Sequence, residues 1–410
     1  MSPQPARGSS LARERLIAQL AVQRAALLTK RVLRTLDLPP SSPVPSTPLT
    51  PTGSQNIPWY LHSATAQTAN NGRRCSVAKP DASPVTIADF AAQALLISAI
   101  HSAFPHDQFV GEEDSQSLRA DSDLTQQVWE LVSSTKLEDD PEAEALLARP
   151  KTIEEMFRVI DLGGSGKGGK KGRVWALDPI DGTSAFLKGQ QYAISLALIE
   201  DGREVLGVLG CPNLPASAAI IDGRVEENRT TDANGMGVML SAVRGDGCAV
   251  VREMGKGGLK EGRRVDRRKS ATATGPVQLK DLHFVDSLVS PATSSDKVHE
   301  LALRAGARYP GTEVYSSHMR YAAMVLGGRE YVQARIPYHK RAAWCLWDHA
   351  GSQLIYRESG AGRVTDLYGR EIDFGTGRKL SGNWGLITAD ESVHGKVQSL
   401  ITEMLAAGAN

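Results

Sequence analysis

Three groups of acidic residues lie where predicted strands end or helices begin, and their types and spacing could support chemistry. The first group is Glu112–Asp114, the second is Asp178 with Asp181 in "WALDPIDGT", and the third is Asp348 in "WDHAG". Carboxylates repel one another, so a fold that gathers them from separate elements usually does so around cations. Oxygen ligands favour Mg²⁺ or Mn²⁺, and no set of His or Cys residues has zinc spacing.

The stretch "DPIDGT" favours a tight turn that could hold a cation. Pro179 fixes φ at about −65° and stops the strand, so that the side chains of Asp178 and Asp181 and a carbonyl between them can face one point. Gly182 lets the backbone approach closely, and Thr183 adds a hydroxyl. The alternative from the same residues is a surface Asp-Pro turn followed by an Asp-Gly turn, with both acids solvated.

The surrounding pattern predicts the elements that carry these acids. "SPVTIADFAAQALLISAIHSAFP" predicts a helix that opens at Thr86, with Asp89 in its first turn beside the positive helix terminus. "DQFVGEEDS" predicts a short strand that delivers the first acidic group to its end. Residues 115–160 are predicted to be helical and partly irregular, with a capping box from Thr152 to Glu155.

Beyond Val174 the apolar period changes to two, which predicts an antiparallel meander. The hairpin signals are Asp201-Gly202, Asp222-Gly223 and Asp246-Gly247. Residues 253–270 are predicted to form a basic, solvated loop, after which "LHFVDSLV", "SSDKVHELALRAG" and "WDHAGSQLIYRESGAG" predict a strand and two helices. The sequence therefore predicts an N-terminal α+β domain at residues 1–265 and a C-terminal α/β domain at 266–410.

The N-terminal region allows two interpretations. Residues 7–35 are rich in basic side chains and serines, which is typical of a mitochondrial transit peptide. We favour a structural helix capped by Ser10, because apolar residues recur at helical spacing: Leu16, Leu20, Leu27, Leu28, Val32 and Leu36. The Pro-, Ser- and Thr-rich stretch that follows predicts an extended, mobile insertion over residues 38–71.

The composition limits the classes of partner. Lys and Arg total 47 against 46 Asp and Glu, so no global field attracts the chain to nucleic acid or to an acidic membrane. The four cysteines are scattered, and no apolar run is long enough to span a membrane. We therefore expect a soluble, cytoplasmic protein with a small-molecule partner, with mitochondrial targeting as the alternative.

The glycine-rich stretch "GGSGKGGKKGR" at residues 163–173 has the spacing of a phosphate-binding loop. Lys171, however, occupies the position where Ser or Thr should hold Mg²⁺, and the stretch precedes a strand and not a helix. We predict a flexible loop that could lend a lysine to an anionic substrate.

The three acidic motifs also support a family resemblance. "GEEDS", "WALDPIDGT" and "WDHAG", in that order, resemble the signatures of the lithium-sensitive, Mg²⁺-dependent phosphatases of the inositol monophosphatase superfamily. "SPVTIAD", "FLKGQQYAISLALIEDG" and "GCPN" resemble its 3'(2'),5'-bisphosphate nucleotidase branch. The resemblance covers most of residues 10–400 and implies a two-domain, layered α-β-α-β-α sandwich.

The resemblance implies a role for each site residue. Two or three Mg²⁺ ions, with Mn²⁺ as a substitute and Li⁺ as an inhibitor, would be held by Glu112, Asp178, the carbonyl of Ile180, Asp181 and Asp348. Asp89 and Thr183 would activate water. The substrate would be bound by Thr183, Ser317, Arg320, Arg335 and Asp348. Arg320 stands where the family often has a lysine, and "AAWCL" replaces an acidic-lysine pair.

The implied activity is hydrolysis of the 3'-phosphate of adenosine 3',5'-bisphosphate to AMP and phosphate, which clears a by-product of sulfate activation. Its sulfated form, 3'-phosphoadenylyl sulfate, is a second candidate substrate, and we expect a monomer. One alternative is a phosphatase of the same fold that acts on inositol phosphates or another small phosphate ester. The other is a catalytically silent regulator that binds phosphorylated metabolites.

Overall fold

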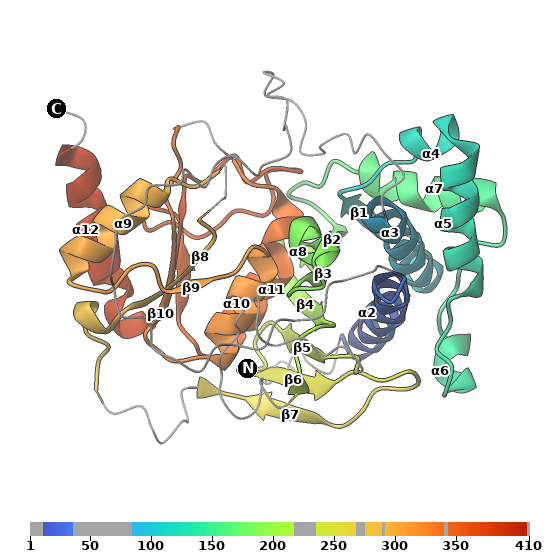
Figure 1. The fold of residues 1–410 in the computed structure, drawn as a ribbon, viewed down its shortest axis with the longest axis horizontal. Coiled ribbons are helices and arrows are strands. Elements are labelled where there is room, and N and C mark those ends of the chain that lie inside the picture. The colour runs from blue at the N-terminus through green and yellow to red at the C-terminus, as the bar shows by residue number, and fades with distance from the viewer. Residues whose placement is uncertain are drawn as a thin grey trace, which may run out of the picture.

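The fold consists of two β-sheets with helices on and between them (Figure 1). The computed structural model describes residues 11–35, 84–216, 235–267, 275–288, 292–339 and 343–407. Four predictions lie outside these residues: the cap at Ser10, the helical position of Leu36, the insertion at 38–71 and the hairpin at Asp222-Gly223.

The first sheet has its seven strands in chain order. They are β1 (Gln108–Gly111), β2 (Arg173–Asp181), β3 (Ala193–Glu200), β4 (Arg203–Cys211), β5 (Val238–Val243), β6 (Ala249–Glu253) and β7 (Gly262–Val265). Strands β1 and β2 are parallel, and every later neighbour is antiparallel. The predicted meander is confirmed at Asp201-Gly202, where both residues have positive φ (49° and 78°), as a type I′ hairpin turn requires.

The predicted loop at 253–270 is wrong in part, because β7 pairs with β6 at the edge of this sheet. Arg263 and Arg264 in β7 are exposed, so the basic residues that suggested a loop instead cover a sheet edge. Charged side chains on an edge strand discourage pairing with another chain.

Helix α2 (Ala12–Leu33) confirms the prediction of a structural first helix. It packs against α3 and β4, and Leu20 and Leu28 are buried, although Leu16 is 41% exposed. Arg24 is also buried, and its guanidinium donates to the carbonyls of Leu95, Leu147 and Ala148. A basic residue of this helix is therefore part of the core.

Helix α3 (Pro84–Ala103) begins two residues earlier than predicted. Proline fits the first position of a helix because the N–H that it lacks would have no partner there. Asp89 consequently lies in the second turn, and its predicted place in the first turn is wrong. The helices between β1 and β2 are α4 (Gln116–Ala120), α5 (Ser122–Ser134), α6 (Pro141–Ala145) and α7 (Ile153–Gly164). One half of the predicted capping box of α7 is confirmed, since the Thr152 side chain accepts from Glu155 N at 3.1 Å. The Glu155 carboxylate accepts from the backbone N–H of Lys151.

The second sheet has the order β11-β12-β10-β8-β9. Its strands are β8 (His283–Asp286), β9 (Thr312–Glu313), β10 (Tyr331–Arg335), β11 (Arg363–Thr365) and β12 (Leu386–Ala389). Strand β8 is parallel to β9 and β10, whereas β12 is antiparallel to β10 and β11. Its helices are α9 (Ser295–Ala305), α10 (Ser317–Leu326), α11 (Ala350–Glu358) and α12 (Glu391–Ala407). Shorter elements are the 3₁₀ turn η4 (Leu279–Asp281), the helix α8 (Thr183–Leu187) and the 3₁₀ turn η5 (Leu346–Asp348).

The elements stack in five layers, as the resemblance implied. From right to left, Figure 1 shows α2 and α3, the first sheet, α10 and α11, the second sheet, and α9 with α12. Separate clusters of buried apolar side chains fill the spaces between the layers. The middle cluster joins Leu240 of the first sheet to Met319 of α10 and Val285 of the second sheet. The domain division at 265/266 stays a prediction.

In the part of the chain that the structure describes, no helix is both long and apolar enough to cross a membrane.

Candidate active site

Glu112 and Asp178 are brought together by the parallel pairing of β1 with β2. Gly111 at the end of β1 is the register partner of Leu177 in β2. The residues that follow these two are Glu112 and Asp178, so both carboxylates lie at the same end of the paired strands. Asp178 is 2% exposed. Parallel pairing therefore unites two of the predicted ligands that are far apart in the sequence.

The surroundings of Asp178 show that the other predicted acids are also close. Burial raises the pKa of Asp178 well above its ordinary value, and the negative charges of Glu112, Asp181, Asp348 and Asp89 raise this pKa further. Its Oδ1 is buried and has no hydrogen-bond partner among the described residues. Five carboxylates, from α3, β2, η5 and the end of β1, thus lie close enough to act on one another electrostatically.

These residues fit a divalent cation in charge and in donor chemistry. Hard oxygen donors that repel one another are stabilised by Mg²⁺. Within the described ranges, however, no three His, Cys, Asp or Glu side chains are already grouped as a metal site would require. The acids are therefore in the same region but not arranged at coordination distances.

The turn "DPIDGT" is built differently from the prediction. Strand β2 does not stop at Pro179 but runs to Asp181 with a register shift between Asp178 and Asp181. Proline cannot donate to a strand ladder, so a bulge is where a sheet tolerates it. Within the shifted segment the carbonyl of Ile180 accepts from the Thr183 hydroxyl at 3.4 Å, and its role as a metal ligand stays a prediction.

Asp181 is fixed by the N-terminus of α10. Its Oδ2 accepts from the Ser316 hydroxyl and from the backbone N–H of His318, both at 2.6 Å. Gly182 has a φ of 91°, and a Cβ there would lie 2.9 Å from Cβ of Ser316. The glycine therefore permits both the turn and the contact, and the positive helix terminus favours the carboxylate. Sequence reasoning missed Ser316, although a serine before an apolar run is a capping signal.

Asp89 and Thr183 lie on two helices that contact each other, α3 and α8. Asp89 is fully buried, whereas Thr183 is half-buried as the first residue of α8. Asp89 is among the acids that raise the pKa of Asp178. The structure thus brings Asp89 to the carboxylate cluster, and its pairing with Thr183 stays a prediction.

Asp348 ends the turn η5, and His349 follows it at the start of α11. The His349 ring is buried, with Nε2 3.1 Å from Nη1 of Arg335 and Nδ1 3.1 Å from the Tyr321 hydroxyl. Burial, followed by the charge of Arg335, holds the pKa of His349 well below its usual range. The neutral imidazole accepts from the guanidinium and so links the turn that carries Asp348 to β10.

The predicted substrate residues form a buried basic pair. Arg320 and Arg335 are 2% and 5% exposed, and both donate to the Ser317 hydroxyl, at 3.0 and 3.4 Å. Burial and the charge of Arg320 lower the pKa of Arg335 to about 10. No carboxylate lies within ion-pair distance of either guanidinium in the described ranges. Two like charges held together in this way favour an anion between or beside them.

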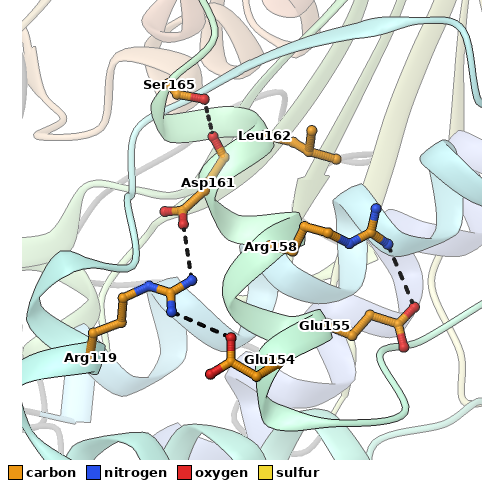
Figure 2. Close-up of a pocket in the computed structure, with 7 residues that line it drawn as sticks. All are labelled: Arg119, Glu154, Glu155, Arg158, Asp161, Leu162 and Ser165. Carbon is orange, nitrogen blue, oxygen red and sulfur yellow. Dashed lines mark hydrogen bonds and ion pairs between the residues drawn. The ribbon is translucent and has the colours of Figure 1, made fainter.

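A separate hollow of about 680 Å³ lies beside α7, and Figure 2 shows the residues that line it. Its charged groups satisfy one another, since Arg119 pairs with Glu154 and Asp161, and Arg158 pairs with Glu155. None of the predicted site residues lines it. We therefore place the candidate active site at the carboxylate cluster and not in this hollow.

Comparisons with known proteins identify the family of the chain. Residues 60–405 match the model of the inositol monophosphatase family. The chain belongs to this family. It is 36% identical over 397 residues to a 3'(2'),5'-bisphosphate nucleotidase of Emericella nidulans, covering 97% of this chain and 99% of the relative.

Other family members are also similar along most of the chain. A 3'(2'),5'-bisphosphate nucleotidase of Schizosaccharomyces pombe is 37% identical over 330 residues, covering 78% of this chain and 84% of the relative. Among solved structures, an inositol monophosphatase from Zymomonas mobilis has a TM-score of 0.50 at 16% identity and covers 97% of this chain and 100% of its own. At that identity the structural likeness supports the fold alone.

Proposed function

We propose that the protein is a metal-dependent phosphomonoesterase that removes the 3'-phosphate of adenosine 3',5'-bisphosphate, with 3'-phosphoadenylyl sulfate as a second substrate. The observation that carries the proposal is the set of four acids around the buried Asp178 carboxylate. The bisphosphate nucleotidases at 36% and 37% identity support the choice of substrate.

Two or three Mg²⁺ ions would bind to Glu112, Asp178, the carbonyl of Ile180, Asp181 and Asp348. When bound, Mg²⁺ lowers the pKa of water and neutralises the charge of the transferred phosphoryl group. The chain's own task is to hold its oxygens in place, and the bonds from Ser316 and His318 to Asp181 already do so.

Thr183 and Asp89 would direct the attacking water. In this proposal the Thr183 hydroxyl accepts a proton from the water, while the carboxylate of Asp89 accepts the proton of the hydroxyl. Asp89 is fully buried and lies among the acids around Asp178, which supports this role.

The basic pair would bind the remainder of the nucleotide. Arg320 and Arg335 can present guanidinium forks to the 5'-phosphate, with Ser317 between them as a further donor. Thr183 and Asp348 would border the scissile phosphate. We further propose that the enzyme works as a cytoplasmic monomer, is inhibited by Li⁺ and serves sulfate assimilation.

Phosphate release from a panel of substrates tests this proposal. The panel contains adenosine 3',5'-bisphosphate, 3'-phosphoadenylyl sulfate, inositol 1-phosphate and a sugar phosphate, with Mg²⁺ and then Li⁺ titrated. We expect kcat/KM for the bisphosphate to exceed that for inositol 1-phosphate by more than about tenfold, because only the nucleotide satisfies the basic pair. A preference for inositol 1-phosphate would contradict the substrate. Binding of the nucleotide without turnover would indicate a regulator.

A further inference from the structure

The Arg378 side chain contacts two backbone segments and the ring of Trp347. Its Nη2 donates to the carbonyl of Gly111 at 2.8 Å, and its Nη1 donates to the carbonyls of Gly163 and Gly166, each at 3.0 Å. The guanidinium also lies over the ring of Trp347, with Cζ 4.6 Å from the ring centroid. One planar, five-donor group therefore contacts four separate positions.

Two of these positions are next to predicted metal ligands. Gly111 immediately precedes Glu112, and Trp347 immediately precedes Asp348. The backbone of Arg378 also contacts the turn that carries Asp348, since Leu346 N in η5 donates to the carbonyl of Arg378 at 2.9 Å. Arg378 thus connects the segment that carries Glu112 with the turn that carries Asp348.

The same contacts explain the glycine-rich stretch that resembled a phosphate-binding loop. Gly163 and Gly166 direct carbonyls toward Arg378, whereas a phosphate loop directs N–H groups toward its ligand. A Cβ at Gly166 would overlap the carbonyl of Phe109 in β1, so only glycine allows this approach. The start of the stretch therefore accepts hydrogen bonds from a guanidinium and holds no anion in this arrangement.

We propose that Arg378 is a positioning residue for the metal site, one that sets the separation between Glu112 and Asp348 without contacting metal or substrate. This inference rests on the proposed function, because it takes those two residues as ligands. Lysine cannot replace the arginine, since a single ammonium cannot bridge the three carbonyls and lie flat on Trp347. Loss of the bridge should weaken metal binding more than it weakens the fold.

Calorimetric titration of Mg²⁺ and Mn²⁺ into the metal-free full chain, without substrate, tests this role for Arg378→Lys and Arg378→Gln. The matched control is Arg329→Lys, because Arg329 also makes three bonds, two to Asp390 and one to the carbonyl of Gly275, yet contacts neither ligand segment. We expect metal affinity to fall about tenfold in Arg378→Lys and further in Arg378→Gln. Arg329→Lys should bind metal as the wild type does.

The half-saturating Mg²⁺ concentration for phosphate release should rise by the same factor, with kcat at saturating Mg²⁺ nearly unchanged. Unchanged metal affinity in folded Arg378 variants would overturn the proposal, as would an equal loss in Arg329→Lys. Unfolding of both Arg378 variants, seen by circular dichroism, would make the residue structural and would also overturn it. Turnover by the wild type tests the proposed function, whereas the ratio of variant to wild-type metal affinity tests the role of Arg378. Either proposal can therefore be contradicted without the other.

Discussion

Asp178 is buried among like charges in the candidate site. Four other carboxylates and burial all disfavour its charged form, so the metal-free protein is destabilised by the arrangement that would bind the cation. The cluster thus lowers the stability of the metal-free protein at the site that the proposed reaction needs, and a bound cation would restore that stability.

Asp178→Asn should therefore stabilise the metal-free protein. The amide has nearly the same shape but no charge, so the repulsion from its neighbours is removed. We expect Tm in EDTA at pH 7.5 to rise by about 2 °C relative to wild type. In saturating Mg²⁺ the order should reverse, because only the wild type gains the full binding energy of the ion. A lower Tm for the variant than for the wild type in EDTA would show that the charge of Asp178 does not destabilise the metal-free protein.

At the residue scale the sequence identified the acids but not the groups that hold them. Glu112 and Asp348 lie at element ends that turn residues and periodicity reveal, and Asp178 was found from its Asp-Pro turn signal although β2 continues past it to Asp181. Ser316 and Arg378 could not be found in this way, since their contacts with Asp181 and Gly111 depend on how distant elements pack.

At the scale of elements, the turn after β2 is fixed by its contact with the start of α10. Gly182 combines a positive φ with a close approach to Ser316, and these two demands can be separated experimentally. Gly245 has a similar φ of 88°, but a methyl group at that position would have no described atom within 4 Å beyond its chain neighbours.

Gly182→Ala should accordingly be more harmful than Gly245→Ala. The left-handed backbone alone should cost each variant about 1–2 kcal/mol of unfolding free energy. Gly182→Ala also forces Ser316 away from Asp181, so its loss of stability should be larger and its phosphate release should fall. Urea unfolding and activity assays measure both effects. Equal losses of stability with normal turnover in both variants would mean that the Ser316 contact is unimportant.

Local patterns predicted the elements well where capping and turn residues act alone. The hairpin at Asp201-Gly202 and the cap at Thr152 are such cases. The prediction for the start of α3 was wrong because Pro84 can open a helix. The prediction of a loop at β7 was wrong because pairing with β6 outweighs the basic composition of this strand. Such outcomes depend on contacts with distant parts of the chain, which the local sequence pattern does not specify.

At the scale of the whole molecule, the five layers place α10 and α11 between the sheets, and the site lies where these helices begin. Asp181 from the first sheet contacts the start of α10, and Asp348 precedes α11. The order of strands in the second sheet could not be predicted, because it depends on pairing between segments far apart in the sequence, such as β10 with β8 and β12.

The packing of α12 on the second sheet should make stability depend on pH. His394 is 2% exposed, and burial together with Arg363 lowers its pKa to about 4. The unfolded chain, with a pKa of about 6.5, binds the proton more readily in this range. The stabilisation is therefore complete above about pH 6.5 and is lost as the pH falls toward 4.

Unfolding free energies from urea titrations at pH 7.5 and 4.5 measure this effect. We expect the wild type to lose about 2 kcal/mol more than His394→Gln between these values, because the glutamine cannot take up the proton. His339→Gln, at an exposed position, should behave as the wild type does. Parallel losses in the wild type and His394→Gln would contradict the assignment.

The central claim, that the acids around Asp178 hold a catalytic cation, is tested most directly with Asp181→Asn. The amide oxygen can still accept from Ser316 and His318, so the fold and Tm should be retained. We expect Mg²⁺-dependent phosphate release from adenosine 3',5'-bisphosphate to fall more than about 100-fold in this variant. Turnover near the wild-type rate in a folded Asp181→Asn protein would contradict the account.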